Sequence, residues 1–266
     1  MRSFTILFVF ATIVALALAS TSDNVEAISQ VVEIHRLRPQ TGSAGHRVPQ
    51  VDCLSWRLAV ETNNLRDWKL VPKQCENYVG HYMLGKQYRH DCEAVADAAI
   101  EYAKGLKLGG DGKDVCVFDV DETILSNIPF FARCDVAFGA LPYNATKFDE
   151  WIADGKLPAI PSIRCVYNTV LSLGIKPVLL TGATENFRQS RTTNLKKVGY
   201  RNWFKLILRG DKDTGSAVEY KSSKRTELVK AGYRIVGNIG DQWSDLIGEN
   251  VGAHTFKVPD PMYYVG

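Results

Sequence analysis

Two aspartates stand one residue apart, at Asp119 and Asp121, and this spacing favours the binding of a divalent cation. Residues two apart in an extended segment project to the same side, so both carboxylates can face one pocket. Two carboxylates held close together repel each other, and a divalent cation beside them would remove that repulsion. The alternative is that the pair simply ends a strand and caps the next helix.

The segment before the aspartates supplies the element that must position them. Val115 to Phe118 is a short apolar run with β-branched residues, and the turn-rich Gly109 to Gly112 precedes it. This pattern predicts a buried strand. Open α/β sheets bind ligands in the crevice beyond the carboxyl ends of their strands, so the aspartates stand where a site is expected.

Three later segments place polar residues in comparable positions. Two of these segments end apolar runs that predict strands, and the third opens a predicted helix. Their polar residues are Thr181 with Gly182, then Lys221, then Asp241 with Asp245.

The four segments, in this order, resemble the signatures of the haloacid dehalogenase superfamily, of which Asp119-x-Asp121-x-Thr123 is the first. The chain from Asn238 to Leu246 and from Pro259 to Tyr264 resembles one branch in more detail. That branch is the plant acid phosphatase and vegetative storage protein family, which is class B-like.

The resemblance covers roughly residues 50 to 266 and implies an α/β fold, a haloacid-dehalogenase-like Rossmannoid parallel sheet with helices on both faces. The alternation of predicted strands and helices independently favours such a sheet. We expect an N-terminal helical region over 51–110 and a phosphatase core over 111–266. An insertion at about 124–161 resembles a small cap over the site, although an ordinary connecting subdomain is the alternative.

The resemblance also implies roles for the aspartates. Asp119 would be the nucleophile that forms an aspartyl-phosphate, and Asp121 would protonate the leaving group and later deprotonate the attacking water. Mg²⁺ would bind the Asp119 carboxylate, the Asp121 backbone carbonyl and Asp241. Asp245 would support the ion from the second shell or through a water.

The phosphoryl oxygens need donors and a positive charge. Thr181 offers a hydroxyl and Gly182 a backbone N–H. Lys221 would supply the charge, because Tyr220-Lys221-Ser222 with Arg225 matches the family pattern; Lys224, on the same predicted helix, is the alternative.

Apolar spacing sets further expectations for the helices. An amphipathic helix should follow Asp91, and its apolar face should be formed by Val95, Ala98, Ala99, Tyr102, Ala103 and Leu106. Another helix should run from about Ser223 to Gly232.

The first 19 residues have the form of a secretory signal peptide, an apolar run ending in the small-residue site Ala17-Leu18-Ala19. A membrane anchor is the alternative, but a spanning helix needs about 20 apolar residues. Residues 20–50 predict a loosely ordered leader. No later run is long enough to span, so we expect no membrane contact after cleavage and an extracellular or vacuolar location.

Six cysteines follow the predicted signal peptide, so disulfides are expected in an oxidising compartment. Their spacing does not favour a zinc site. Cys116 lies in the predicted central strand and Cys165 on an apolar helical face, and we interpret both as small core residues. Bridges are therefore favoured among the others, Cys53, Cys75, Cys92 and Cys134.

Composition and net charge limit the classes of partner that we expect for this chain. A 45% hydrophobic and 23% charged chain is ordinary for a globular protein. A net charge of +3 without a Lys/Arg cluster gives no reason to expect a nucleic-acid partner. The sequon Asn144-Ala145-Thr146 predicts an N-glycan on Asn144 in the insertion.

Three functions compete on these residues. The first is a Mg²⁺-dependent acid phosphatase acting on small-molecule phosphate monoesters. The second is a storage protein that keeps the fold as an amino-acid reserve, and the intact Asp119 favours activity over it. The third is a phosphotransferase using the same motifs. The substrate and the oligomeric state stay open, with a homodimer among the options.

Overall fold

The computed structural model describes residues 51–266, which form one compact unit. The predicted signal peptide and leader lie outside the described residues. Within that part of the chain, none of the helices is long and apolar enough to cross a membrane.

A parallel sheet forms the centre of the unit, with the strand order β3-β2-β1-β4-β5. Its strands are β1 (Asp114–Phe118), β2 (Lys176–Thr184), β3 (Lys205–Arg209), β4 (Arg234–Gly240) and β5 (Thr255–Lys257). The strand that precedes the aspartates is thus the middle strand, buried at every residue. This architecture confirms the predicted α/β sheet.

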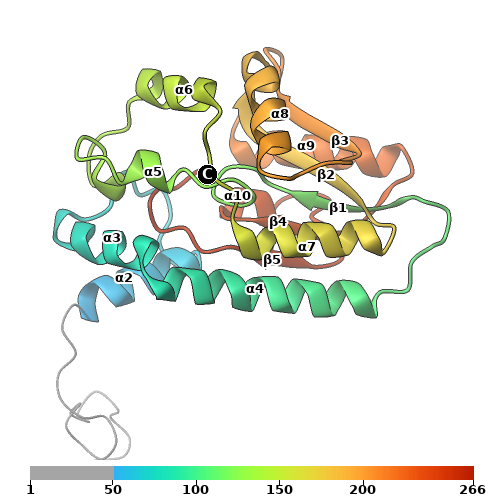
Figure 1. The fold of residues 1–266 in the computed structure, drawn as a ribbon, viewed down its shortest axis with the longest axis horizontal. Coiled ribbons are helices and arrows are strands. Elements are labelled where there is room, and N and C mark those ends of the chain that lie inside the picture. Colours follow the sequence, from blue (N-terminus) through green and yellow to red (C-terminus); the bar gives the residue numbers. More distant parts are fainter. Residues whose placement is uncertain (1–50) are drawn as a thin grey trace, which may run out of the picture. The chain divides into compact units, whose positions relative to one another are not determined.

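Helices cover both faces of the sheet (Figure 1). The α-helices are α2 (Val51–Glu61), α3 (Glu76–Leu84), α4 (Lys86–Gly105), α5 (Ile128–Phe131), α6 (Ala145–Asp154), α7 (Pro161–Ser172), α8 (Arg188–Lys197), α9 (Ala217–Lys230) and α10 (Trp243–Leu246). Short 3₁₀ turns are η3 (Lys73–Cys75), η4 (Ala137–Gly139) and η5 (Glu185–Phe187).

The alternation of side chains along β1 divides the core in two. Cys116 and Phe118 join a large apolar cluster with residues of α4 and α7. Val115 and Val117 point to the other face and join a smaller cluster that includes Leu228 of α9. Burial on both faces explains why the strand reads as a continuous apolar run.

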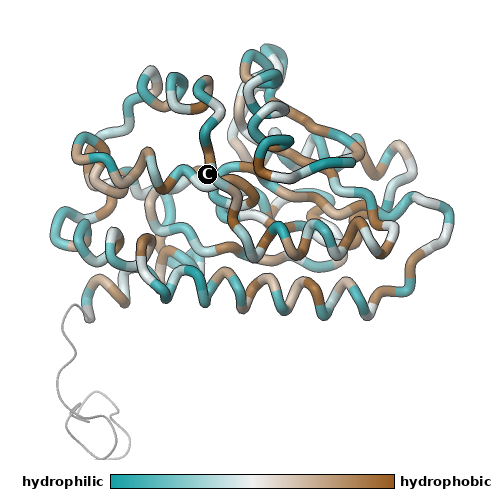
Figure 2. Tube along the Cα trace, in the orientation of Figure 1, coloured by the Kyte–Doolittle hydropathy of each residue, from teal (hydrophilic) through white to brown (hydrophobic). Residues whose placement is uncertain are grey.

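Helix α4 confirms its prediction only in part. It begins at Lys86, before Asp91, and Ala98 of the predicted face is exposed while Val95 is half-buried. The buried residues are Tyr88, Cys92, Ala96, Ala99 and Ala103, spaced three or four apart, so Ala99 and Ala103 are buried as predicted. These small residues let α4 pack closely on α7. Figure 2 shows apolar and polar residues alternating along α4.

Helix α9 begins earlier than predicted, at Ala217 instead of about Ser223. Ser216 accepts a hydrogen bond from the Glu219 N–H, and the Glu219 side chain accepts one from the Ser216 N–H. This capping box starts the helix six residues upstream. Lys221 therefore lies in the second turn.

The predicted insertion leaves and returns through a narrow neck. Leu125 pairs with Ala159 in an antiparallel bridge, and the Ser126 N–H donates to the Pro158 carbonyl at 2.9 Å. Helices α5 and α6 lie between these two ends, and α6 contacts α8. The two ends of the insertion therefore meet at one neck, while its body also contacts α3 and α8; the segment between these ends is called the cap below.

The cysteine prediction is correct in part. Cys53 and Cys75 form a disulfide, whereas Cys92 and Cys134 are free in the described chain. Cys116 is buried as predicted. Cys165 is exposed, so its interpretation as a core residue was wrong: its neighbours Ile163 and Val166 carry the buried face of α7.

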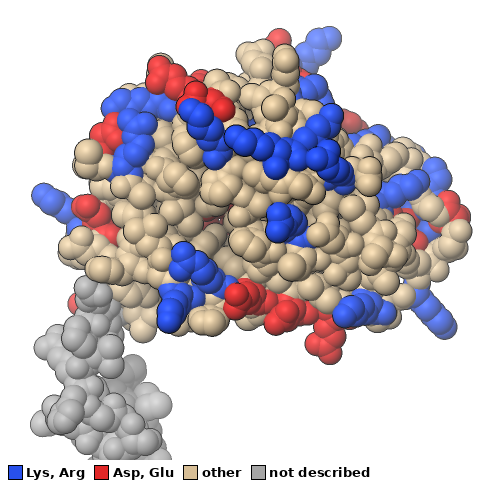
Figure 3. Space-filling view, in the orientation of Figure 1, with Lys and Arg blue, Asp and Glu red and all other residues tan. Residues whose placement is uncertain are grey.

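Charged side chains of both signs appear on the face drawn in Figure 3, with uncharged surface between them. This distribution agrees with the small net charge of the chain.

Candidate active site

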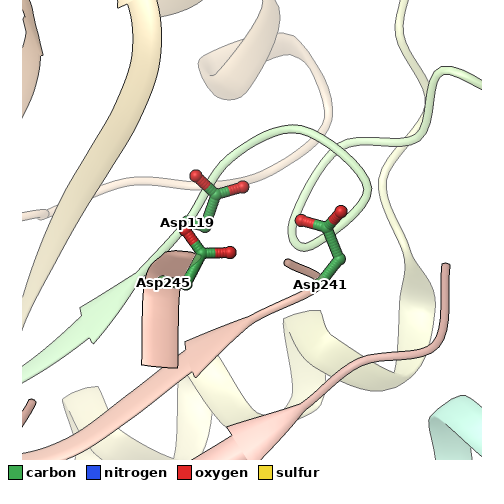
Figure 4. Close-up of side chains that lie close together, drawn as sticks. All are labelled: Asp119, Asp241 and Asp245. Atoms are coloured by element: carbon green, nitrogen blue, oxygen red, sulfur yellow. The ribbon is translucent and has the colours of Figure 1, made fainter. Parts of the chain in front are cut away.

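Three buried aspartates converge at the carboxyl end of the sheet. Asp119 follows β1, Asp241 follows the neighbouring β4, and Asp245 comes from α10; one oxygen of each lies within 4.8 Å of the others (Figure 4). The Asp119 N–H donates to the Ile239 carbonyl at 2.9 Å, which continues the sheet bonding to the site. A side chain at Gly240 would collide with Asp245, so this approach requires glycine.

The three carboxylates supply the donors that a hard divalent cation needs. Mg²⁺ prefers oxygen ligands and usually takes only one or two carboxylates together with waters and substrate oxygens. Burial raises the pKa of Asp241 well above its ordinary value, and the nearby Asp260 and Asp245 raise it further. A cation here would oppose that rise and keep the carboxylates ionised. The residues present therefore fit such an ion.

Lys221 reaches into this cluster from α9. Its Nζ lies 2.6 Å from Oδ1 of Asp119 and also contacts Asp245. Burial opposes the charge of Lys221, but the two carboxylates outweigh it and raise its pKa. Burial also raises the pKa of Asp119, and Lys221 opposes that rise. Lys221 is thus a buried cation beside Asp119, the predicted nucleophile.

Lys224, the alternative lysine, lies outside the cluster. Its Nζ pairs with Asp213 at 2.8 Å and with Glu227 at 3.2 Å. One helical turn separates Lys221 from this position, and only Lys221 faces the aspartates.

Asp121 has a different set of partners from Asp119. Nη2 of Arg191 lies 2.6 and 2.7 Å from its two oxygens, and Nδ2 of Asn127 donates to it at 2.9 Å. The Thr181 hydroxyl lies 3.4 Å away, and Gly182 follows it as an exposed residue of β2. The two aspartates therefore share a region but not their contacts.

The cap contributes to the position of Asp121. Nε1 of Trp151, in α6, donates to Oδ1 of Asn127 at 2.9 Å, and Asn127 in turn donates to Asp121. A change in the position of α6 would therefore be transmitted to Asp121 through one amide side chain.

Asp241 accepts hydrogen bonds from three side chains. The donors are the Thr123 hydroxyl at 3.1 Å, Nε2 of Gln242 at 2.8 Å and the Tyr263 hydroxyl at 3.2 Å. These bonds fix the direction of the carboxylate, as partners of metal ligands do. Arg225 fixes Asp245 in another way, by donating to its backbone carbonyl at 2.8 Å.

A pocket that opens to solvent lies beside the cap. Aromatic residues of the cap form much of its wall, and Tyr263, which also donates to Asp241, lines it too. Its aromatic lining residues are Phe130, Phe131, Tyr143 and Tyr263.

The structure brings together six of the predicted site residues, namely Asp119, Asp121, Thr181, Lys221, Asp241 and Asp245. Asn144 is exposed at the start of α6, where its side chain caps the helix by accepting from the Lys147 N–H. Sequence reasoning missed Arg191, Asn127 and Trp151, because no local pattern marks residues of a polar helix and a cap as neighbours of Asp121.

Comparisons with known proteins found a family model and several relatives that match this chain. A family model described as HAD superfamily, subfamily IIIB (acid phosphatase), matches residues 40–266. The chain is 44% identical over 217 residues to "Acid phosphatase 1" of Solanum lycopersicum, covering 81% of this chain and 84% of that protein. It is 44% identical over 232 residues to "Stem 28 kDa glycoprotein" of Glycine max, covering 86% and 89%. It is 36% identical over 216 residues to "Vegetative storage protein 1" of Arabidopsis thaliana, covering 80% and 79%.

Proposed function

Because the chain belongs to the acid phosphatases of HAD subfamily IIIB, we propose that it hydrolyses small-molecule phosphate monoesters with Mg²⁺, through a phosphorylated Asp119. The observation that carries this proposal is the convergence of Asp119, Lys221 and two further buried carboxylates at the end of the middle strand.

In the first half-reaction, a carboxylate oxygen of Asp119 attacks phosphorus and the ester P–O bond breaks. Asp121 gives its proton to the departing oxygen, so the alcohol leaves neutral. The ammonium of Lys221 and the Thr181 hydroxyl stabilise negative charge on the phosphoryl oxygens.

In the second half-reaction, water attacks the phosphoryl group on Asp119. Asp121, now ionised, accepts a proton from that water, and the bond between phosphorus and the Asp119 oxygen breaks. Inorganic phosphate is released, and both carboxyl groups return to their starting states. One side chain thus serves as acid and then as base.

Asp119, Asp241 and the backbone carbonyl of Asp121 would hold Mg²⁺, with Asp245 supporting them directly or through water. The ion would reduce the repulsion between the carboxylate and a negatively charged phosphate.

A storage role is the second candidate, and the 36% identity to a vegetative storage protein favours it. The names of the stem and storage relatives also support a secreted or vacuolar location. Storage and catalysis are compatible, since the predicted nucleophile is present in this chain.

The test is hydrolysis of p-nitrophenyl phosphate by the purified protein, with Mg²⁺ and after EDTA. We expect turnover that requires the metal and is absent from Asp119→Asn. No turnover by the unmodified protein between about pH 4 and 8, the range over which ordinary carboxyl and imidazole groups ionise, would favour storage alone. Faster product formation with added alcohol acceptors would favour a phosphotransferase.

A further inference from the structure

Arg191 is a buried cation whose bonding capacity is only partly used. It lies on α8 with 1% of its surface exposed, and a single nitrogen, Nη2, contacts both oxygens of Asp121. Within residues 51–266, its Nε and Nη1 are buried and have no hydrogen-bond partner. Buried donors are nearly always paired, so these two require an acceptor that the chain itself does not supply.

A structural role does not explain these free donors. Asn194, one turn further along α8, binds Leu157: its side chain accepts from the Leu157 N–H at 3.0 Å and donates to the Leu157 carbonyl at 2.8 Å. Leu157 belongs to the last part of the cap, so Asn194 already attaches α8 to the cap without a buried guanidinium. Leaving its N–H groups unpaired has a substantial energetic cost.

The surroundings of Arg191 identify the acceptor as an anion. Asp121 and the Thr181 hydroxyl lie within 3.4 Å of each other, and both are assigned to the reacting phosphate in the proposed function. The guanidinium is rigid and planar, so its free N–H groups lie beside the nitrogen that holds Asp121. A planar fork of this kind suits the oxygens of a phosphate.

The charge balance of the site agrees with a second cation. The site holds four aspartates, which carry four negative charges if all are ionised: Asp119, Asp121, Asp241 and Asp245. Lys221 supplies one positive charge on the Asp119 side. Arg191 supplies another on the Asp121 side. With a divalent cation, the sum over these residues is zero when Arg191 is counted and negative when it is left out, so Arg191 reduces the repulsion of a phosphate dianion.

We propose that Arg191 is the second cation of the phosphate site: Nη2 orients Asp121 and the free N–H groups bind a phosphoryl oxygen. This inference rests on the proposed function for the identity of the anion. Arg191 stays protonated and transfers no proton, so Asp121 remains the acid.

Binding of inorganic phosphate tests this contact without requiring turnover. Calorimetric titration in the presence of Mg²⁺ would compare the wild-type protein with Arg191→Met and Arg191→Lys. The matched control is Lys196→Met, which removes one positive charge from an exposed position of the same helix. Circular dichroism would establish that each variant is folded.

We expect Arg191→Met to bind phosphate about 10- to 100-fold more weakly, the usual effect of losing a hydrogen bond from a charged group. Arg191→Lys should also bind more weakly, because one ammonium cannot reach both Asp121 and the phosphate. Lys196→Met should bind as the wild type does. Unchanged phosphate binding by folded Arg191→Met, or by Arg191→Lys if the methionine variant does not fold, would overturn the inference.

A separate measurement tests whether Arg191 orients Asp121. Arg191→Met should slow hydrolysis of an alkyl phosphate more than hydrolysis of p-nitrophenyl phosphate, because only the poor leaving group depends strongly on a well-placed proton donor. An equal loss for both esters would contradict the orienting role. If the wild type binds phosphate in an Arg191-dependent manner but hydrolyses neither ester, the proposed function fails and the phosphate contact stands.

Discussion

Nζ of Lys221 lies 2.6 Å from Oδ1 of Asp119, although 102 residues separate them in the chain. The middle strand supplies the carboxylate and the second turn of α9 supplies the ammonium. A charge pair buried at this depth is poorly screened by solvent, so each partner strongly affects the other.

Replacing Lys221 should therefore remove most of the activity. Lys221→Met leaves Asp119 and Asp245 without their cation and the phosphoryl oxygens without its charge, so turnover should fall by about 10²–10³. Lys224→Met is the matched control, since Lys224 pairs with Asp213 outside the site. Steady-state rates on p-nitrophenyl phosphate check this, and equal losses in both variants would contradict the assignment of Lys221.

The two catalytic aspartates should be distinguishable by their substitutions. Asp119→Asn removes the attacking charge and one metal ligand, so turnover should fall to background. Asp121→Asn keeps the nucleophile and removes the proton donor, so its loss should be about 10²–10⁴ and smallest for good leaving groups. Rates on a series of aryl and alkyl phosphates separate the two. Metal-dependent turnover at the wild-type rate by Asp119→Asn would exclude it as the nucleophile.

Glu122 should make the stability of the metal-free protein depend on pH. Burial raises the pKa of this carboxyl well above its ordinary value of 4.5, so the folded chain keeps a proton that the unfolded chain releases. Stability should therefore fall as the pH rises from 4.5 towards the raised pKa, by up to about 1.4 kcal/mol per pH unit.

The stability of Glu122→Gln should not decrease in this way as the pH rises, and the variant should be more stable than the wild type at neutral pH. Its amide oxygen can still accept from the Asn127 N–H. Urea unfolding in EDTA between about pH 4.5 and 7.5 checks this against Glu101→Gln, an exposed control on α4. A stability difference from the wild type that stays constant with pH would show that Glu122 does not hold the proton.

The disulfide between Cys53 and Cys75 should stabilise the fold. Their sequence separation of 22 predicts a loss of about 3 kcal/mol in the free energy of unfolding for the double serine variant. Cys134→Ser, at a free and exposed cysteine, should change it little. Alkylation of the unfolded, unreduced protein should leave two cysteines unlabelled, and labelling of all six would refute the bridge.

Asn144 should carry a glycan in protein from a eukaryotic secretory host, because it is exposed at the start of α6. Glycosidase treatment should then reduce the mass. Thr146→Ala is the informative control: it removes the sequon and leaves the Asn144 cap of the helix in place. A wild-type mass that matches Thr146→Ala apart from the substitution would exclude glycosylation.

The sequence predicted the parts of the site that local patterns encode. Asp119 and Asp241 were found because each follows an apolar run, and parallel strands bring their carboxyl ends to one edge. The start of α9 was misplaced because the capping box lies before the motif that holds Lys221. The apolar runs thus locate strands well and helix starts less well.

The partners of Asp121 could not have been predicted in this way. Arg191 is 70 residues distant, on a helix whose sequence is almost entirely polar and shows no buried face. Asn127 reaches Asp121 only because the neck of the cap folds back on itself. The Arg191 contact depends on tertiary packing and the Asn127 contact on an irregular turn, and a single sequence reveals neither.

The bridge between Cys53 and Cys75 has a further consequence for proteolysis. It spans the loop between α2 and α3, so a single cleavage there would leave α2 covalently attached. Two contacts of Glu61 at the end of α2 would also persist. Its backbone carbonyl accepts a hydrogen bond from Nε1 of Trp243 in α10, and the Glu61 carboxylate pairs with Lys257 of β5. A nicked chain would thus keep the fold and the site of the intact one.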